Sequence, residues 1–217
     1  SALFGGGKIQ IGSRSIRMQA IIAEGGFSYV YKAIDSSTQT KYAMKKIIVQ
    51  SVEADKDVRK EIDMLQRFKH THIIDLIDYC FVHESGNKVA YLLFPHYEKS
   101  LRNVLDDASR TNAHGRDSKL PLMKILKHFK EICESVDFIH TQNFVHNDIK
   151  PENVLMCPSS SSSSSSSSLS SDVVLVDFGS VLPAIKEIKT RNDSLRVSEE
   201  AAQICTLPYR APELFDP

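Results

Sequence analysis

The segment His-Asn-Asp-Ile-Lys-Pro-Glu-Asn, residues 146–153, decides how this sequence is interpreted. The surrounding residues 143–156 lack the periodicity of a helix or a strand and predict irregular backbone. A lone Asp or Asn is most often a turn residue. Here Asp148 and Asn153 stand five residues apart with Lys150 between them. That spacing favours a chemical role over a plain turn.

Four other short segments accompany it in a fixed order. They are Glu-Gly-Gly-Phe-Ser-Tyr-Val at 24–30, Tyr-Ala-Met-Lys at 42–45, Asp-Phe-Gly at 177–179 and Ala-Pro-Glu at 211–213. Each alone has an ordinary explanation, because a Gly-Gly pair between strands is usually a hairpin and a lysine is usually a surface charge. All five in this order are not easily explained by chance.

Composition limits the class of protein. The chain has 217 residues and a mass of 24.3 kDa, which fits one large domain or two small lobes. Apolar residues make up 41% and charged residues 25%, as in ordinary soluble globular proteins. The 27 basic and 27 acidic residues cancel, which argues against a nucleic-acid binder that acts through bulk charge.

The cysteines and the apolar runs predict an intracellular protein. Cysteines at positions 80, 133, 157 and 205 form no Cys-x-x-Cys pair, so we expect reduced thiols and neither a disulfide framework nor a zinc site. No apolar run approaches the roughly 20 residues of a membrane helix. The first residues show neither a signal-peptide pattern nor the Met-Gly start of a myristoylated protein.

The first part of the chain predicts a β-sheet with one helix. Five segments rich in β-branched and aromatic residues are expected to be strands: residues 17–23, 29–35, 41–49, 75–83 and 89–94. After the third segment, Val58, Ile62, Leu65 and Phe68 recur at helical spacing.

The second part predicts mainly helix. Pro121 opens a segment with one apolar stripe, which we expect to pack in the core: positions 122, 125, 126, 129, 132, 133, 136 and 139. Ten serines at 159–168 have no side chain that could offset the entropy of ordering, so we predict a disordered loop between short strands at 153–156 and 172–176.

Taken together, the five segments resemble the signature set of eukaryotic protein kinases. The resemblance covers about residues 15–217 apart from the serine run. It implies an α+β, protein-kinase-like bilobal fold. The expected parts are a β-rich N-lobe with one main helix at 1–94, a hinge at 95–97 and a mainly helical, partial C-lobe at 98–217. The C-lobe would contain the serine-rich insertion at 159–171 and the activation segment at 177–213.

The resemblance assigns catalytic roles to residues of the second part. Asp148 would be the base that orients and accepts the proton of the substrate hydroxyl, and Lys150 would reach the transferred γ-phosphate. Thr206 would brace both of them, with a simple loop threonine as the alternative. Asn153 and Asp177 would supply oxygen ligands to Mg²⁺, a hard cation.

The resemblance also implies an ATP site. Lys45 would hold the α- and β-phosphates and would be anchored by Glu61. The turn that covers the phosphates would contain Ala23, Gly25, Gly26, Phe27 and Ser28, with the glycines allowing close approach of backbone amides. The residues expected around the adenine are Val30, Ala43, Phe94, Pro95, Tyr97 and Leu155. Of these, Phe94 would be the gatekeeper, while Pro95 would offer its carbonyl and Tyr97 its backbone amide.

The class of kinase is suggested by further details. Lys-Pro-Glu-Asn at 150–153 resembles serine/threonine kinases. The segments 24–30 and 204–215 are similar to the Numb-associated kinase family. The resemblance implies ATP, Mg²⁺ and protein substrates with Ser or Thr, and no nucleic acid. It also implies an intracellular, cytoplasmic protein. Members of that family reach Golgi or vesicle membranes through lipidated N-termini, and no lipidation motif is visible here.

Three departures from the kinase pattern stand out. Asn147 occupies the position of an Arg that usually clamps an activation-loop phosphate, so we expect no switch of that kind. Ala23 stands where the first glycine is usual, which would weaken phosphate contact. The chain ends four residues after Glu213, and we interpret it as an incomplete C-lobe.

Alternatives remain open at this point. Lys45, Asp148 and Asp177 are all present, which favours an active enzyme over a pseudokinase or nucleotide-binding scaffold without useful turnover. A nucleic-acid or lipid-binding module lacks the expected basic and aromatic surface. In the activation segment, Thr190, Ser194 and Ser198 are candidate phosphorylation sites, with unmodified loop residues as the alternative. The serine run is interpreted as expanded filler, with a further site of modification as the alternative.

Overall fold

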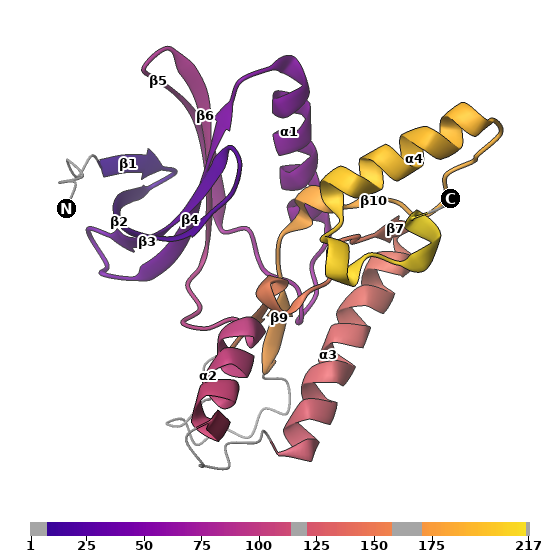
Figure 1. Cartoon of the computed structure of the whole chain (residues 1–217). Helices are drawn as coiled ribbons and strands as arrows, with labels where there is room; N and C mark the ends of the chain where they lie inside the picture. Colours follow the sequence, from indigo (N-terminus) through magenta and orange to yellow (C-terminus); the bar gives the residue numbers. More distant parts are fainter. Residues whose placement is uncertain (1–7, 114–120, 158–170, 216–217) are drawn as a thin grey trace. The chain divides into compact units, whose positions relative to one another are not determined.

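The computed structural model describes residues 8–113, 121–157 and 171–215 (Figure 1). The chain divides into two compact units. The first comprises Ser1–Lys69 and Ile74–His96, and the second comprises His70–Ile73 and Tyr97–Pro217. A β-rich first unit and a mainly helical second unit confirm the expected α+β class.

The first unit is an antiparallel sheet of six strands in the order β1-β2-β3-β4-β6-β5. The strands are β1 (Lys8–Ile11), β2 (Arg14–Glu24), β3 (Ser28–Asp35), β4 (Lys41–Val49), β5 (Asp78–Glu84) and β6 (Asn87–Pro95). The sequence predicted five of them and missed β1, whose alternating burial follows its Lys-Ile-Gln-Ile pattern.

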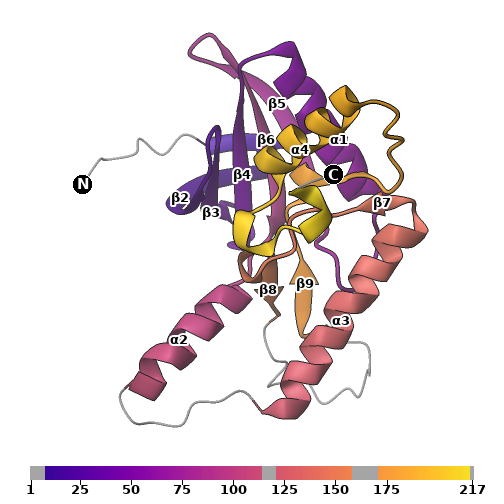
Figure 2. The same cartoon turned by 45° about the vertical axis from the view of Figure 1, so that its right-hand side comes forward.

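Helix α1 (Val52–Arg67) lies beside this sheet, as Figures 1 and 2 both show. Its start is capped by the Ser51 hydroxyl, which accepts a hydrogen bond from the Ala54 amide at 3.0 Å. The buried side chains Val58, Ile62 and Leu65 lie on one stripe, as the helical spacing predicted. This burial fixes which face of α1 meets the sheet.

The two faces of the sheet have different roles. One face carries a core cluster of buried residues, namely Ile9, Ile11, Ile16, Ala33, Met44, Val89, Tyr91 and Leu93. Side chains alternate between faces along a strand. The neighbours of Met44 on β4, Ala43 and Lys45, therefore project from the opposite face. The core cluster thus covers one face of β4, and the opposite face, with Ala43 and Lys45, is available for a binding site.

The second unit contains helices, short hairpins and 3₁₀ turns. Its helices are α2 (Leu101–Ala113), α3 (Leu122–Thr141) and α4 (Arg191–Ile204). Its antiparallel strand pairs are β7 (Phe144–Val145) with β10 (Leu182–Pro183) and β8 (Val154–Met156) with β9 (Val173–Leu175). Its 3₁₀ turns are Pro151–Asn153, Phe178–Ser180, Leu207–Tyr209 and Pro212–Leu214.

Strands β8 and β9 are the two short strands that the sequence predicted on either side of the serine run (Figure 2). The disorder predicted for the run itself concerns residues 158–170, which lie outside the described residues. The hairpin matters for the site because Asn153 immediately precedes β8 and Asp177 follows shortly after β9.

The activation segment was expected to be a loop, and for residues 191–204 this was wrong. They form α4, which starts with a capping box: the Thr190 hydroxyl accepts from the Asp193 amide, and the Asp193 carboxylate accepts from the Thr190 amide. The Thr-Arg-Asn-Asp sequence was the available signal. Thr190, a candidate phosphorylation site, is therefore a helix cap.

The structure also describes the cysteines and the lengths of the helices. None of the four cysteines, all of them in the described part, forms a disulfide. Within residues 8–113, 121–157 and 171–215, no helix has the length and apolar character needed to cross a bilayer.

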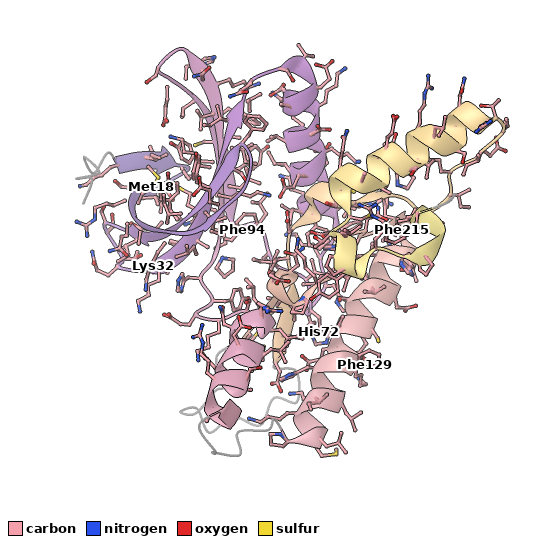
Figure 3. The ribbon with its side chains drawn as sticks, viewed as in Figure 1. Met18, Lys32, His72, Phe94, Phe129 and Phe215 are labelled. Carbon is pink, nitrogen blue, oxygen red and sulfur yellow. The ribbon has the colours of Figure 1, made fainter. Side chains whose placement is uncertain are left out.

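The apolar stripe of α3 was expected in the core, and this is correct only near its C-terminal end. Ile139 is fully buried. Leu122, Ile125, Leu126 and Phe129 are exposed, with Phe129, labelled in Figure 3, at 64%. Helical periodicity identifies an apolar face, but it does not say whether that face is covered in this chain.

This difference predicts unequal costs of substitution along one helix. Ile139→Ala should lower the free energy of unfolding by about 2–5 kcal/mol, because it leaves a cavity in a packed region. Phe129→Gln should change it by no more than about 0.5 kcal/mol. Denaturant unfolding of both variants measures these values, and equal losses would show that Phe129 is packed in solution.

Candidate active site

The first unit contributes one face of the sheet. Val30 pairs with Lys45, Ala23 pairs with Val30, and Phe94 pairs with Ala43. Directly paired residues share a face, as do residues two apart on one strand. Ala23, Val30, Ala43, Lys45 and Phe94 therefore all project from the face opposite the core cluster. The structure thus groups these predicted nucleotide-binding residues, which span 71 positions of sequence.

Lys45 and Glu61 form a close ion pair on this unit. Lys45 Nζ lies 2.7 Å from Glu61 Oε1, and the side chains are 17% and 7% exposed. Glu61 projects from the buried stripe of α1, so the helix packing described above holds the carboxylate in place. A partly desolvated pair of this kind orients the ammonium group on the sheet face.

The turn between β2 and β3 is narrow at Gly25. The Gly25 amide donates to the Ser28 carbonyl at 2.8 Å, and a Cβ on Gly25 would lie 2.9 Å from Ser28 Oγ. Gly26 has open space around it. Phe27 is exposed at the tip. A side chain at Gly25 would displace the Ser28 hydroxyl, which can rotate away, so the two glycines keep the turn open without being sterically required.

Three remaining adenine-site candidates lie elsewhere. Pro95 is the last residue of β6 in the first unit. Tyr97 is the first residue of the second unit after the boundary at His96. Leu155 is the middle residue of β8, paired with Val174.

The second unit contains a hydrogen-bonded network around Asp148. Thr206 donates to Asp148 Oδ1 from its hydroxyl at 2.6 Å and from its amide at 3.2 Å. Lys150 Nζ lies 2.7 Å from Asp148 Oδ2, and Asn153 Nδ2 donates to the same oxygen at 3.0 Å. Lys150 also donates to the Thr206 hydroxyl at 2.7 Å. The other three predicted catalytic residues, Lys150, Asn153 and Thr206, thus all contact Asp148.

The charge of Asp148 follows from these donors. Burial alone would raise the pKa of the Asp148 carboxyl, but the bonds from Lys150 and Thr206 outweigh it and leave the pKa below its ordinary value. Asp148 is therefore a carboxylate at neutral pH. All four of its usual acceptor positions are used by the donors described above.

His146 and Phe178 pack against each other next to this network. Both are buried, and their rings meet edge to face with centroids 5.2 Å apart. His146 Nδ1 accepts from the Asp148 amide at 3.3 Å, so the proton sits on Nε2, which faces the Val176 carbonyl at 3.1 Å. Burial lowers the pKa of His146, although the Val176 carbonyl opposes this, and the imidazole is neutral.

Asn153 and Asp177 lie on neighbouring backbone. The Val176 amide, next to Asp177, donates to the Asn153 carbonyl at 2.9 Å. Asp177 has the left-handed conformation at φ 66° and ψ 81°, which is uncommon outside glycine and often marks functional sites. One carboxylate and one amide oxygen suit Mg²⁺, which keeps several waters and binds substrate phosphates. Among the described residues, no cluster of three or more His, Cys, Asp or Glu forms a separate metal site.

Comparison with known families now bears on this geometry. A family model described as "Protein kinase domain" matches residues 16–216. The chain belongs to the protein kinase family.

Its relatives are named as serine/threonine kinases. The chain is 33% identical over 214 residues to a probable serine/threonine-protein kinase of Dictyostelium discoideum, covering 97% of this chain and 18% of that protein. A second kinase of the same organism is 34% identical over 249 residues, with 90% and 67% covered. Human "Serine/threonine-protein kinase 16" is 30% identical over 194 residues, with 89% and 59% covered. The chain thus spans about a fifth to two thirds of the length of these relatives.

The kinase-family position usually held by Arg is occupied by Asn147, and the structure shows what Asn does there. Its backbone is left-handed at φ 66°, a conformation that Asn adopts more readily than most residues. Its side-chain amide donates to the Ser180 carbonyl at 3.1 Å. Ser180 in turn donates from its hydroxyl to the Ile204 carbonyl at 3.1 Å. These uncharged links hold the start of the kinase activation segment, and sequence reasoning did not identify them.

The Thr206 hydroxyl in this kinase network should stabilise the fold. Thr206→Val keeps the shape but removes the partner shared by Asp148 and Lys150, so the free energy of unfolding should fall by about 1–3 kcal/mol. Thr206→Ser keeps the hydroxyl and should lose less. Denaturant unfolding compares the two, and an equal loss in both variants would mean that the hydroxyl contributes nothing.

The kinase chain should lose stability as the pH falls below neutrality. Burial, followed by the charge of His72, lowers the pKa of His70 below 6.5. The unfolded chain therefore takes up this proton at a higher pH than the folded chain does. The free energy of unfolding is therefore highest above the ordinary pKa of the unfolded histidine. It declines as the pH falls from there toward the lower pKa of folded His70, by up to about 1.4 kcal/mol per pH unit for each such group.

His70→Phe tests this sign. The variant keeps an aromatic ring against Phe138, whose ring lies 5.0 Å from that of His70, and removes the titrating group. Free energies of unfolding measured between about pH 7 and pH 5 should decline less steeply than in the wild type. An unchanged or steeper decline would contradict the assignment.

Proposed function

We propose that this chain transfers the γ-phosphoryl group of ATP to Ser or Thr hydroxyls of protein substrates. The observation that carries the proposal is the Asp148 carboxylate, held ionised by Lys150, Thr206 and Asn153. A carboxylate fixed in this way can orient a hydroxyl and accept its proton. Phosphoryl transfer depends on such positioning and on charge neutralisation more than on covalent help.

Lys150 has a second role in this proposal. Because the four usual acceptor positions of Asp148 are filled, one donor must leave before a substrate hydroxyl can bind there. Lys150 is the candidate, because its side chain is 21% exposed and its ammonium is attracted to a phosphate. Its departure would free Asp148 Oδ2 for the hydroxyl while Thr206 keeps Oδ1 in place.

The remaining residues would bind the nucleotide and metal. In the first unit, Lys45 would hold phosphate oxygens while Glu61 orients it, and the turn at Gly25 and Gly26 would bring backbone amides, that of Gly26 among them, to the phosphates. In the second unit, Asn153 and Asp177 would hold Mg²⁺. When bound, Mg²⁺ neutralises charge on the phosphates. The donor set, a carboxylate and an amide oxygen, fits a hard cation. The left-handed backbone of Asp177 is a conformation often found at functional sites.

The finer family and the cellular location are also proposals. The segments 24–30 and 204–215 support membership of the Numb-associated kinases, nearest the myristoylated and palmitoylated serine/threonine kinase. Four cysteines without a disulfide support an intracellular, cytoplasmic setting. Golgi or vesicle association would require a lipidated N-terminus. The balanced charge supports protein substrates and no nucleic acid.

The test is phosphate transfer from labelled Mg·ATP to a generic basic protein. Asp148→Asn should lower kcat by about 10²–10⁴-fold, because the amide cannot accept a proton. Asp137→Asn, on the exposed side of α3, is the matched control and should keep wild-type activity.

Binding of Mg·ATP, measured by thermal shift, separates the outcomes. Binding without transfer in the wild type would support the pseudokinase or scaffold alternative. Transfer that survives Asp148→Asn would overturn the assignment of the base. Absence of both binding and transfer would refute the proposed function for this chain.

A further inference from the structure

Asp177 follows the end of β9 by two residues, and the start of β9 is held by a buried carboxylate on α3. We propose that Glu131 is a positioning residue that sets the register of β9 and thereby the position of Asp177. The inference rests on the proposed function in one respect, because Asp177 is taken as a ligand of Mg²⁺. No sequence motif indicated Glu131.

The contacts of Glu131 are close and charged. Its side chain is 6% exposed. One oxygen, Oε2, accepts from the Asp172 amide at 2.9 Å and from the Val173 amide at 3.0 Å. Hydrogen bonds to an ionised acceptor are stronger than neutral ones. Glu131 therefore fixes the first residue of β9 and the residue before it.

Neighbouring side chains support the same segment. Lys127, one turn before Glu131 on α3, lies 2.8 Å from the Asp172 carboxylate. His72, labelled in Figure 3, lies 2.7 Å from the Ser171 hydroxyl through Nδ1. The His72 carbonyl also accepts from the Leu175 amide at 2.9 Å. The start of β9 is thus held from α3 and from the segment His70–Ile73, in addition to its pairing with β8.

The need for such anchors follows from the length of the connection. In a tight hairpin the turn sets the register of the two strands. Here β8 and β9 have three residues each, and residues 157–172 separate them. A long connection constrains register much less than a tight turn does. A slip of one residue would turn the side chains of β9 to the opposite face.

The register matters because both metal-ligand candidates flank this hairpin. Asn153 stands just before β8, and the Val176 amide bonds to its carbonyl. A shift of β9 would break that bond and move Asp177. Glu131 therefore supplies a constraint on register that a connection of this length supplies only weakly. If Glu131 sets the register of β9, the serine run has no part in positioning Asp177, which agrees with its interpretation as filler.

The test uses the full chain and measures the Mg²⁺ dependence of phosphate transfer. Glu131→Ala should raise the Mg²⁺ concentration for half-maximal activity by about 10-fold or more, as loss of a supporting residue does at metal sites. Glu131→Gln should lie nearer the wild type, because its amide oxygen can accept both bonds. Asp137→Asn is the matched control on α3. Its side chain is exposed, and the Mg²⁺ dependence of this variant should not change.

Rescue distinguishes register from general damage. Replacing residues 158–171 by an Asn-Gly turn, which joins the paired positions 157 and 172, should restore the Mg²⁺ dependence of Glu131→Ala, because a tight turn sets the register covalently. The same replacement in the wild type should leave it unchanged. Failure of the rescue in a folded variant would overturn the proposal.

Hydrogen exchange keeps this test independent of turnover. Glu131→Ala should speed exchange at the Val173 and Leu175 amides and leave the buried C-terminal part of α3 protected. Unchanged protection of β9 would overturn the proposed role of Glu131. Faster exchange at β9 in a chain without any phosphate transfer would refute the proposed function and leave the structural role of Glu131 standing.

Discussion

The buried carboxylate of Asp148 is the interaction on which the candidate active site of the second unit depends. It joins residues 58 positions apart, because Thr206 donates to one oxygen while Lys150 and Asn153 bind the other. An unpaired buried carboxylate would be costly, and these donors together stabilise its charge. The hydrogen bonds to Asp148 therefore help to hold residues 146–153, strand β8 and the segment around Thr206 in place.

Most elements of the first unit, and the grouping of residues around Asp148, could be predicted from the sequence. The strands of the first unit and α1 follow from β-branched runs and from the spacing of Val58, Ile62 and Leu65, where a single pattern dictates burial. The grouping of Asp148 with Thr206 came from family resemblance. Neither spacing nor periodicity could have brought together residues so far apart in the chain, since hydrogen bonding between distant loops leaves no local pattern.

Other features could not be foreseen for identifiable reasons. The helix α4 depends on a capping box at Thr190 and Asp193, in a segment where family resemblance suggested a loop. The exposure of Phe129 depends on what covers α3, and an apolar stripe carries no such information. Glu131 acts on backbone amides, which every residue has, so its partners are invisible in the sequence.

The link between Asn147 and Ser180 has a consequence for how the site responds to its solvent. It is a bond between an amide and a carbonyl, with no net charge on either side. Dissolved salt screens separated charges over about 10 Å at 0.1 M, and it leaves a neutral hydrogen bond almost unaffected. The Lys150–Asp148 pair is ionic and partly exposed, and salt weakens it. Ionic strength therefore acts on the candidate base Asp148 and leaves the hydrogen bond from Asn147 to Ser180 in place.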